Sequence, residues 1–228
     1  MQRSIRKIKV LGYPFAGGQG KSGVELTPSW LQNQAWFKNL ANNSSSKMPI
    51  EYEEIQVSNG KSNSYTPEDY LTQSSSEAEN TSNSDEEQVE AKNVLNVISS
   101  SMNLRNQTTK ALKDGYFPIV LGGDHSQAIG SIAGMKRFMP DTKIIWVDAH
   151  IDANTPESSP SRNAHGMPLA FLSGMVPMFK NWSCVDIQRD LCYFGIRSFE
   201  EDEAQMISDN NVLVFEPNEC DLDKMPMI

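Results

Sequence analysis

The chain has 228 residues, of which 38% are hydrophobic and 21% are charged, and its formal net charge is −9 at pH 7. This composition is typical of an ordinary globular domain, and the negative charge argues against nucleic acid as a partner. The sequence contains no run approaching the roughly 20 apolar residues that a membrane-spanning helix requires, so we expect no membrane partner.

The first part of the chain predicts a strand, a helix and a second strand. Residues 6–13 form an apolar, strand-like run, and a glycine-rich loop over 14–28 follows it. Apolar residues at helical spacing predict a helix over 29–41, and a strand is predicted over 50–57. We expect these elements to open one domain that extends over 1–228.

Residues 58–86 differ in composition from the rest of the chain. Ser, Asn, Asp and Glu dominate, and residues 61–90 hold eight acidic residues against one Lys, a net −7 of the total −9. A segment with so few bulky apolar side chains cannot bury enough surface to offset the entropy lost on ordering. We therefore predict a disordered, acidic surface insertion over 58–86.

Strands and helices alternate regularly after the insertion. Strands are predicted over 116–121, 143–148, 190–196 and 211–215, and helices over 87–114, 126–138, 167–174 and from about 200. Repeated strand–helix units predict an α/β fold of three αβα layers, with a mainly parallel sheet between helices on both faces.

All three histidines lie in polar clusters after predicted strands or in the loop beyond them. GGDHS at 122–126 contains His125, DAHID at 148–152 contains His150, and NAHG at 163–166 contains His165. Ligands in parallel α/β sheets bind at the carboxyl ends of the strands, where the first two clusters are predicted to lie. These clusters are therefore the main candidates for a functional site.

The DAHID cluster has the composition of a metal site. If its backbone is extended, Asp148, His150 and Asp152 face the same side, since side chains alternate along a strand. Two carboxylates and an imidazole that converge need a cation to neutralise them, and His125 can join from a neighbouring strand end. Mixed oxygen and nitrogen ligands without thiolate favour Mn²⁺, Mg²⁺, Fe²⁺ or Zn²⁺.

The loop beyond DAHID offers further candidates. A histidine can relay protons near neutral pH, so His165 is a candidate proton carrier, although a loop histidine without a role is an equal alternative. Asn154, Ser161 and Asn163 have the polar groups to bind a small ligand, and ordinary turn chemistry is the alternative reading.

The motifs GGDHSQAIGSIAG, IIWVDAHIDANTP and SRNAHGMPLAFLSG, with the N-terminal GYPFAGGQGKSGVELTP, resemble those of the ureohydrolases and of arginases in particular. The resemblance covers nearly all of 5–220 apart from the insertion. It implies an arginase/deacetylase-type fold, a binuclear manganese centre and a cytoplasmic hydrolase of arginine metabolism and the urea cycle, which forms homotrimers in many members.

The resemblance also implies roles for individual residues. His125 and Asp152 would bind the first manganese, His150 the second, and Asp148 would bridge both. A metal-bridging hydroxide, hydrogen-bonded by Asp152, would attack the guanidinium carbon of L-arginine to give L-ornithine and urea. His165 matches the proton-shuttle histidine of the family.

Substrate contacts follow from the same resemblance. Asn154 and Ser161 match residues that hold the substrate α-carboxylate, with Asn163 beside them. Glu200 and Glu203, in GIRSFEEDE, match acidic residues that help to bind the α-amino group, although Glu200 stands where Asp is usual. The sparse, CxxC-free set of cysteines at 184, 192 and 220 agrees with reduced thiols in the cytoplasm.

Two departures from the family pattern bear on function. Arg162 stands where arginases have Gly, which is costly if that position needs a positive φ. A later Asp-x-Asp pair, in a DVDxxDP-like motif, is missing, and Asp221 and Asp223 lack the strand context to replace it. We therefore expect a C-terminally truncated chain with an incomplete second metal site and little or no activity alone. The alternatives are a non-catalytic regulatory or binding isoform, or another ureohydrolase such as an agmatinase.

Overall fold

A computed structural model of the chain describes residues 7–42, 49–58, 91–176 and 182–216. Its strands are β1 (Lys7–Tyr13), β2 (Ile50–Glu54), β3 (Tyr116–Gly122), β4 (Ile144–Val147), β5 (Leu191–Phe194) and β6 (Leu213–Phe215). Its helices are η1 (Val24–Leu26), α1 (Thr27–Asn33), α2 (Ala35–Asn42), α4 (Val94–Lys113), α5 (Gln127–Phe138), η2 (Ala164–Gly166), α6 (Pro168–Ser173), α7 (Ile187–Asp190) and α8 (Glu201–Asp209). Every strand predicted from the sequence is thereby confirmed. Nearly all of the predicted acidic insertion, residues 59–86, lies outside the described residues.

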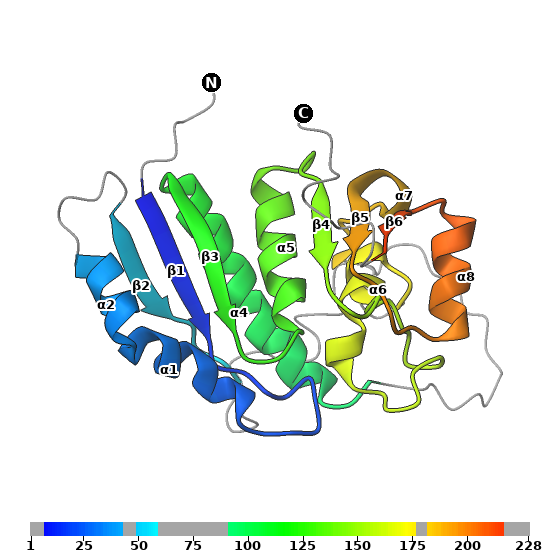
Figure 1. Ribbon diagram of the computed structural model, residues 1–228, viewed down its shortest axis with the longest axis horizontal. Coiled ribbons are helices and arrows are strands. Elements are labelled where there is room, and N and C mark those ends of the chain that lie inside the picture. The colour runs from blue at the N-terminus through cyan, green and yellow to red at the C-terminus, as the bar shows by residue number, and fades with distance from the viewer. Residues whose placement is uncertain (1–6, 43–48, 59–90, 177–181, 217–228) are drawn as a thin grey trace, which may run out of the picture.

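The strands form two parallel sheets among the described residues, with the orders β2-β1-β3 and β4-β5-β6. No described pairing joins β3 to β4, and Figure 1 shows α5 between them. The prediction of parallel strands is confirmed, but the sheet is divided. A crossover helix can connect strands that are not neighbours, so a sequence pattern that identifies strands does not reveal how they pair.

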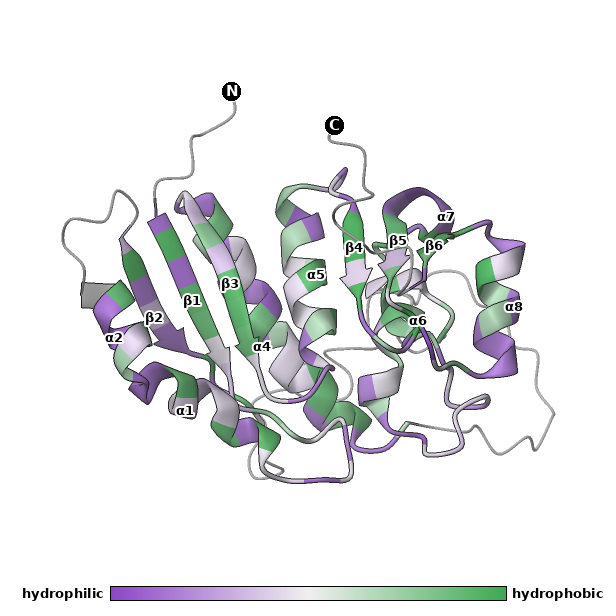
Figure 2. Ribbon diagram, in the orientation of Figure 1, coloured by the Kyte–Doolittle hydropathy of each residue, from purple (hydrophilic) through white to green (hydrophobic). Residues whose placement is uncertain are grey.

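Helices cover both faces of the first sheet. α1 and α2 pack over the face that carries Val10 and Ile119, while α4 and α5 pack over the face that carries Val120. The open edge of β3 borders an apolar groove of about 860 Å³ formed with α4 and α5. Figure 2 shows that β3 and α6 are largely hydrophobic, whereas much of the edge strand β2 is hydrophilic. Charged residues on an edge strand discourage pairing with another chain.

The helix predicted over 29–41 is two helices. The backbone of Gln34 is extended, with ψ at 140°, and separates α1 from α2. The expected continuous apolar stripe is therefore broken: Phe37 is buried, whereas Trp30 is 61% exposed and Leu40 52% exposed. The interruption carries neither Gly nor Pro, so the sequence has no signal for it.

A buried ion pair joins α5 to the end of α7, directly before β5. Lys136 Nζ lies 2.7 Å from Asp190 Oδ2, and the two side chains are 2% and 0% exposed. Arg189 and Lys143, both largely exposed, approach the other oxygen of Asp190 at 2.9 and 3.2 Å. The hydrogen bonds from Arg189 lower the pKa of Asp190 most; burial opposes them, and Lys136 adds to the lowering. This carboxylate is therefore ionised at all ordinary pH values.

The remaining global features concern thiols and membranes. Cys184 and Cys192 are free, and burial raises the pKa of the Cys184 thiol to about 11, so it stays protonated near neutral pH. Cys220 lies outside the described residues. Among the described helices, none has the length and hydrophobicity needed to cross a bilayer.

Candidate metal centre

Two polar loops follow β3 and β4 directly. β3 ends at Gly122 and leads into Asp124 and His125, while β4 ends at Val147 and leads into Asp148. The two strands point the same way in Figure 1, so their carboxyl ends lie at the same edge of the molecule. This is the edge at which parallel α/β sheets bind ligands.

The first loop requires glycine before its acidic and histidine residues. The N–H of Gly123 donates to the Tyr13 carbonyl at 2.9 Å, and the N–H of Asp124 donates to the Phe15 carbonyl at 2.8 Å. A Cβ atom on Gly123 would lie 1.9 Å from the Phe15 oxygen, so any other residue would push the loop away from the end of β1. Glycine therefore allows the close approach that positions His125.

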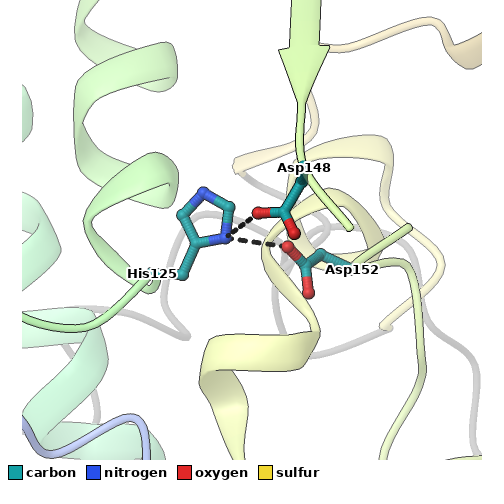
Figure 3. Close-up of side chains that lie close together, drawn as sticks. All are labelled: His125, Asp148 and Asp152. Atoms are coloured by element: carbon teal, nitrogen blue, oxygen red, sulfur yellow. Dashed lines mark ion pairs between the residues drawn. The ribbon is translucent and has the colours of Figure 1, made fainter. Parts of the chain in front are cut away.

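Three of the predicted ligands converge. His125 Nδ1 lies 2.8 Å from Asp152 Oδ2 and 3.4 Å from Asp148 Oδ2. One ligand atom from each of the three residues lies within 4.8 Å of the others. Figure 3 shows the imidazole and the two carboxylates pointing toward one another. The three side chains come from loops after two different strands, as expected of a site at the sheet edge.

The electrostatics of this group favour a bound cation. Burial lowers the pKa of His125, but the adjacent Asp152 carboxylate and the charge of Asp148 outweigh it, so the pKa is raised. Asp152 Oδ2 is buried, and apart from the His125 ring nitrogen 2.8 Å away it has no partner among the described residues. Two carboxylates against one imidazole leave excess negative charge, and a divalent cation would both neutralise it and satisfy the buried oxygen. The donor set therefore fits a metal such as Mn²⁺.

His150 lies at the rim of this group and outside it. Its side chain is 61% exposed, and its Nδ1 is 3.4 Å from Asp148 Oδ1. The prediction that an extended DAHID segment aligns its three polar side chains is wrong, because the backbone bends over 148–150 and Asp152 has a φ of 56°. Asp148 and Asp152 converge through this loop conformation and not through strand alternation.

His165 is held by the loop that follows β1. Its backbone N–H lies 2.9 Å and its Nδ1 3.0 Å from the Gly18 carbonyl oxygen. Since a carbonyl only accepts, Nδ1 carries the proton and Nε2 keeps a lone pair in the neutral ring. The N–H of Gly18 in turn donates to the buried Asp124 carboxylate at 2.7 Å. The sequence analysis did not predict this role of Asp124 and Gly18. The only signal for it was the presence of two glycine-rich segments, 14–28 and 122–126, whose backbones can approach each other closely.

A polar cavity of about 540 Å³ collects every residue that the sequence singled out for the site. They are His125, Asp148, His150, Asp152, Asn154, Ser161, Asn163, His165, Glu200 and Glu203. Within it, Asn154 Nδ2 donates to Glu200 Oε2 at 2.9 Å, and Ser161 Oγ accepts from the Asn163 N–H at 3.3 Å. The individual roles of these residues stay predictions.

Arg162 lies next to this cavity in the sequence and has a positive φ, the conformation that is costly for a residue standing where Gly is usual. Its φ is 56°, and its carbonyl accepts from the Lys92 N–H at 2.8 Å. Left-handed backbone costs a residue with a Cβ roughly 1–2 kcal/mol, a cost that glycine avoids.

We expect Arg162→Gly to stabilise the chain by about 1 kcal/mol, after allowing for the greater freedom of glycine in the unfolded state. For a chain of this size the melting temperature should rise by roughly 2–4 °C in a thermal melt. Arg162→Ala is the matched control, because it removes the charge and keeps the strain, and it should not stabilise. An equal increase in the melting temperature of both variants would mean that the stabilisation comes from removal of the charge and not from relief of backbone strain.

Comparison with known proteins gives consistent matches. A sequence model of the Arginase family matches residues 6–228. Human Arginase-1 is 31% identical over 229 residues, covering 97% of this chain and 63% of that protein. A crystal structure of arginase from Bacillus subtilis aligns with a TM-score of 0.72 at 28% identity, over 95% of this chain and 65% of the other. Entamoeba histolytica arginase, solved in complex with L-ornithine, aligns with a TM-score of 0.71 at 29% identity, over 95% and 67%. The chain spans 61–65% of the length of the curated relatives that it matches.

Proposed function

This chain belongs to the arginase family, and we propose that its polar cavity is built to hydrolyse the guanidinium group of L-arginine to L-ornithine and urea. The observation that carries the proposal is the convergence of His125, Asp148 and Asp152, whose ligand atoms lie within 4.8 Å of one another. A guanidinium carbon is a poor electrophile, so its hydrolysis needs a strong nucleophile at neutral pH and a proton donor for the leaving amine.

The proposed metal is Mn²⁺, held by His125, Asp148 and Asp152, with His150 at the rim as a ligand of a second ion. When bound, the metal would supply the Lewis acidity that lowers the pKa of water toward neutrality. The protein itself would orient the three side chains that bind the metal. The buried Asp152 carboxylate would also offer an acceptor oxygen to orient the attacking water, since among the described residues its Oδ2 contacts only the His125 ring.

His165 is the proposed proton carrier. It lines the cavity, and the Gly18 carbonyl accepts from its Nδ1 at 3.0 Å. That contact leaves Nε2 free to take up a proton and to deliver it to the leaving amine. The anchored ring would therefore need no change of tautomer between these two steps.

The proposed substrate contacts divide by charge. Asn154, Ser161 and Asn163 would donate to the substrate α-carboxylate, and Glu200, with Glu203 behind it, would attract the α-ammonium group. The complex of the Entamoeba histolytica relative with L-ornithine supports an amino-acid ligand of this type. A decarboxylated substrate such as agmatine would leave the first set of donors unpaired, so arginine is favoured over an agmatinase-like reading.

Activity of the 228-residue chain by itself is expected to be low. The metal centre that the family resemblance implies takes a later Asp-x-Asp pair in a DVDxxDP-like motif, and the sequence contains no such motif. We predict that the purified chain binds Mn²⁺ and releases urea from arginine at least roughly 100-fold more slowly than a full-length arginase. Calorimetric titration with Mn²⁺ and a urea assay with arginine and agmatine test this.

Each outcome of that experiment is decisive. Urea release at the rate of a full-length enzyme would contradict the low-activity expectation, and a preference for agmatine would contradict the substrate. Absence of Mn²⁺ binding would contradict the metal centre. Binding without turnover, together with a mixed oligomer on co-expression with a full-length arginase, would favour the non-catalytic alternative. We also propose a cytoplasmic location, which cell fractionation tests. Size-exclusion chromatography decides whether this chain forms the trimer that the family resemblance implies for many arginases.

A further inference from the structure

The segment 151–153, which contains the metal-ligand candidate Asp152, is anchored at three successive residues. The Tyr193 hydroxyl donates to the Ile151 carbonyl at 2.9 Å, and the Leu169 N–H donates to the Asp152 carbonyl at 3.0 Å. The Ala153 N–H donates to Glu203 Oε1 at 2.9 Å. These partners come from β5, α6 and α8, so three separate elements act on one short stretch of backbone.

The backbone needs such support because Asp152 adopts a left-handed conformation. Its φ is 56°, a region that costs residues with a Cβ up to roughly 1–2 kcal/mol, although Asp enters it more readily than most residues do. Conformations of this kind persist only where the surroundings over-determine them. At this position the conformation has a consequence, since it turns the buried carboxylate toward His125, 2.8 Å from its Nδ1.

Among the three anchors, Glu203 is the one whose side chain is acidic and buried. The residue is 2% exposed, and Oε2 accepts from the Glu200 N–H at 3.1 Å in the capping box that starts α8. The capping box requires only that one bond of the Glu203 side chain. The other oxygen, Oε1, accepts from the N–H of Ala153, which lies 50 positions earlier in the chain and directly follows the proposed metal ligand Asp152. Burial raises the pKa of Glu203 to about 7, so the fold bears a desolvation cost to keep this side chain where it is.

We infer that Glu203 is a positioning residue, which holds the Ala153 peptide so that Asp152 keeps its left-handed conformation and presents its carboxylate to the metal beside His125. The inference rests on the proposed metal function, and it gives Glu203 a role other than direct contact with the substrate. Both oxygens of its carboxylate are engaged by backbone N–H groups, so the side chain acts through the loop. Partners behind metal ligands commonly control affinity in this way.

The test compares Mn²⁺ affinity with stability in the 228-residue chain. Glu203→Ala removes both acceptors and should weaken Mn²⁺ binding roughly 10- to 100-fold in calorimetric titration. Glu203→Gln keeps one acceptor for Ala153 and should retain more of the affinity. Met206→Ala, which truncates a partly buried side chain of the same helix, is the matched control for lost stability, and the exposed Asp202→Asn is the control for lost charge. Both controls should bind Mn²⁺ as the unsubstituted chain does.

A second readout works without metal. In the metal-free chain, hydrogen exchange at the Ala153 amide should quicken at least about tenfold in Glu203→Ala relative to Met206→Ala, because the amide loses its acceptor. Unchanged exchange, or an Mn²⁺ affinity no lower than that of Met206→Ala, would overturn the positioning role. Failure of the unsubstituted chain to bind Mn²⁺ would instead overturn the proposed function, and the exchange measurement would still decide whether Glu203 holds the loop.

Discussion

Replacing Asp152 with glycine should abolish specific Mn²⁺ binding while leaving the fold at least as stable as before. The substitution removes the buried carboxylate whose Oδ2 lies 2.8 Å from His125 Nδ1. It also removes the cost of a φ of 56°, which glycine adopts freely. Loss of an outer partner alone typically weakens metal binding 10- to 100-fold, so loss of a ligand should weaken it by at least roughly 100-fold.

Calorimetric titration with Mn²⁺ and thermal melts measure the two effects separately. Glu157→Gln is the matched control, because Glu157 is an exposed acidic residue of the same loop that does not line the cavity. It should bind Mn²⁺ as the unsubstituted chain does. An affinity of Asp152→Gly within a few-fold of the unsubstituted chain would mean that Asp152 is not a ligand.

Replacing Lys136 with methionine should destabilise the fold by about 2–3 kcal/mol, the cost of losing a buried hydrogen bond to a charged group. The loss stays below that of a fully uncompensated buried charge, because Arg189 still donates to both oxygens of Asp190. Lys136 and Asp190 are 2% and 0% exposed, so the variant leaves the carboxylate buried without its 2.7 Å partner. Lys143→Met is the matched control, since Lys143 pairs with the same carboxylate but is 60% exposed. It should cost no more than about 1 kcal/mol. Urea denaturation at pH 7 measures both values, and similar losses for the two variants would contradict the argument from burial.

The same pair predicts how stability depends on pH. The pKa of Asp190 in the folded chain lies below its ordinary value of 3.8, chiefly because of the Arg189 hydrogen bonds, with Lys136 contributing. The unfolded chain therefore takes up a proton first as the pH falls. The stabilisation from Asp190 is complete above about pH 5 and is lost progressively as the pH falls below it. This acid-dependent loss should be smaller in Lys136→Met, because one cause of the lowered pKa is gone.

The sequence predicted strand positions well because each strand is an apolar run bounded by polar or glycine-rich residues. The sequence did not predict features that depend on more than the local pattern of apolar and polar residues. Nothing in the residues around Gln34 marks the break between α1 and α2. The separation of the strands into β2-β1-β3 and β4-β5-β6 depends on contacts between distant segments, which periodicity does not encode.

In the candidate site, too, the residue types could be predicted from the sequence but their geometry could not. The residue types in GGDHS and DAHID were enough to predict that carboxylates and an imidazole meet near the strand ends, because parallel α/β sheets place the carboxyl ends of their strands at one edge. The role of His165 in NAHG as a proton carrier stays a prediction. The sequence did not predict how these side chains come together. Asp148 and Asp152 converge because Asp152 is left-handed, and the proton position of His165 depends on a carbonyl 147 residues earlier in the chain.

The sequence by itself therefore determined the chemistry: which residues stand at the strand ends, and that a cation suits them. The tertiary structure decided the geometry: that His150 stays at the rim, that Arg162 occupies a left-handed position, and that Glu203 engages the backbone beside Asp152. The physical reason is that ligand type is a property of single side chains. Their orientation depends on hydrogen bonds between backbone groups far apart in the chain, which exist only once the fold has brought them together.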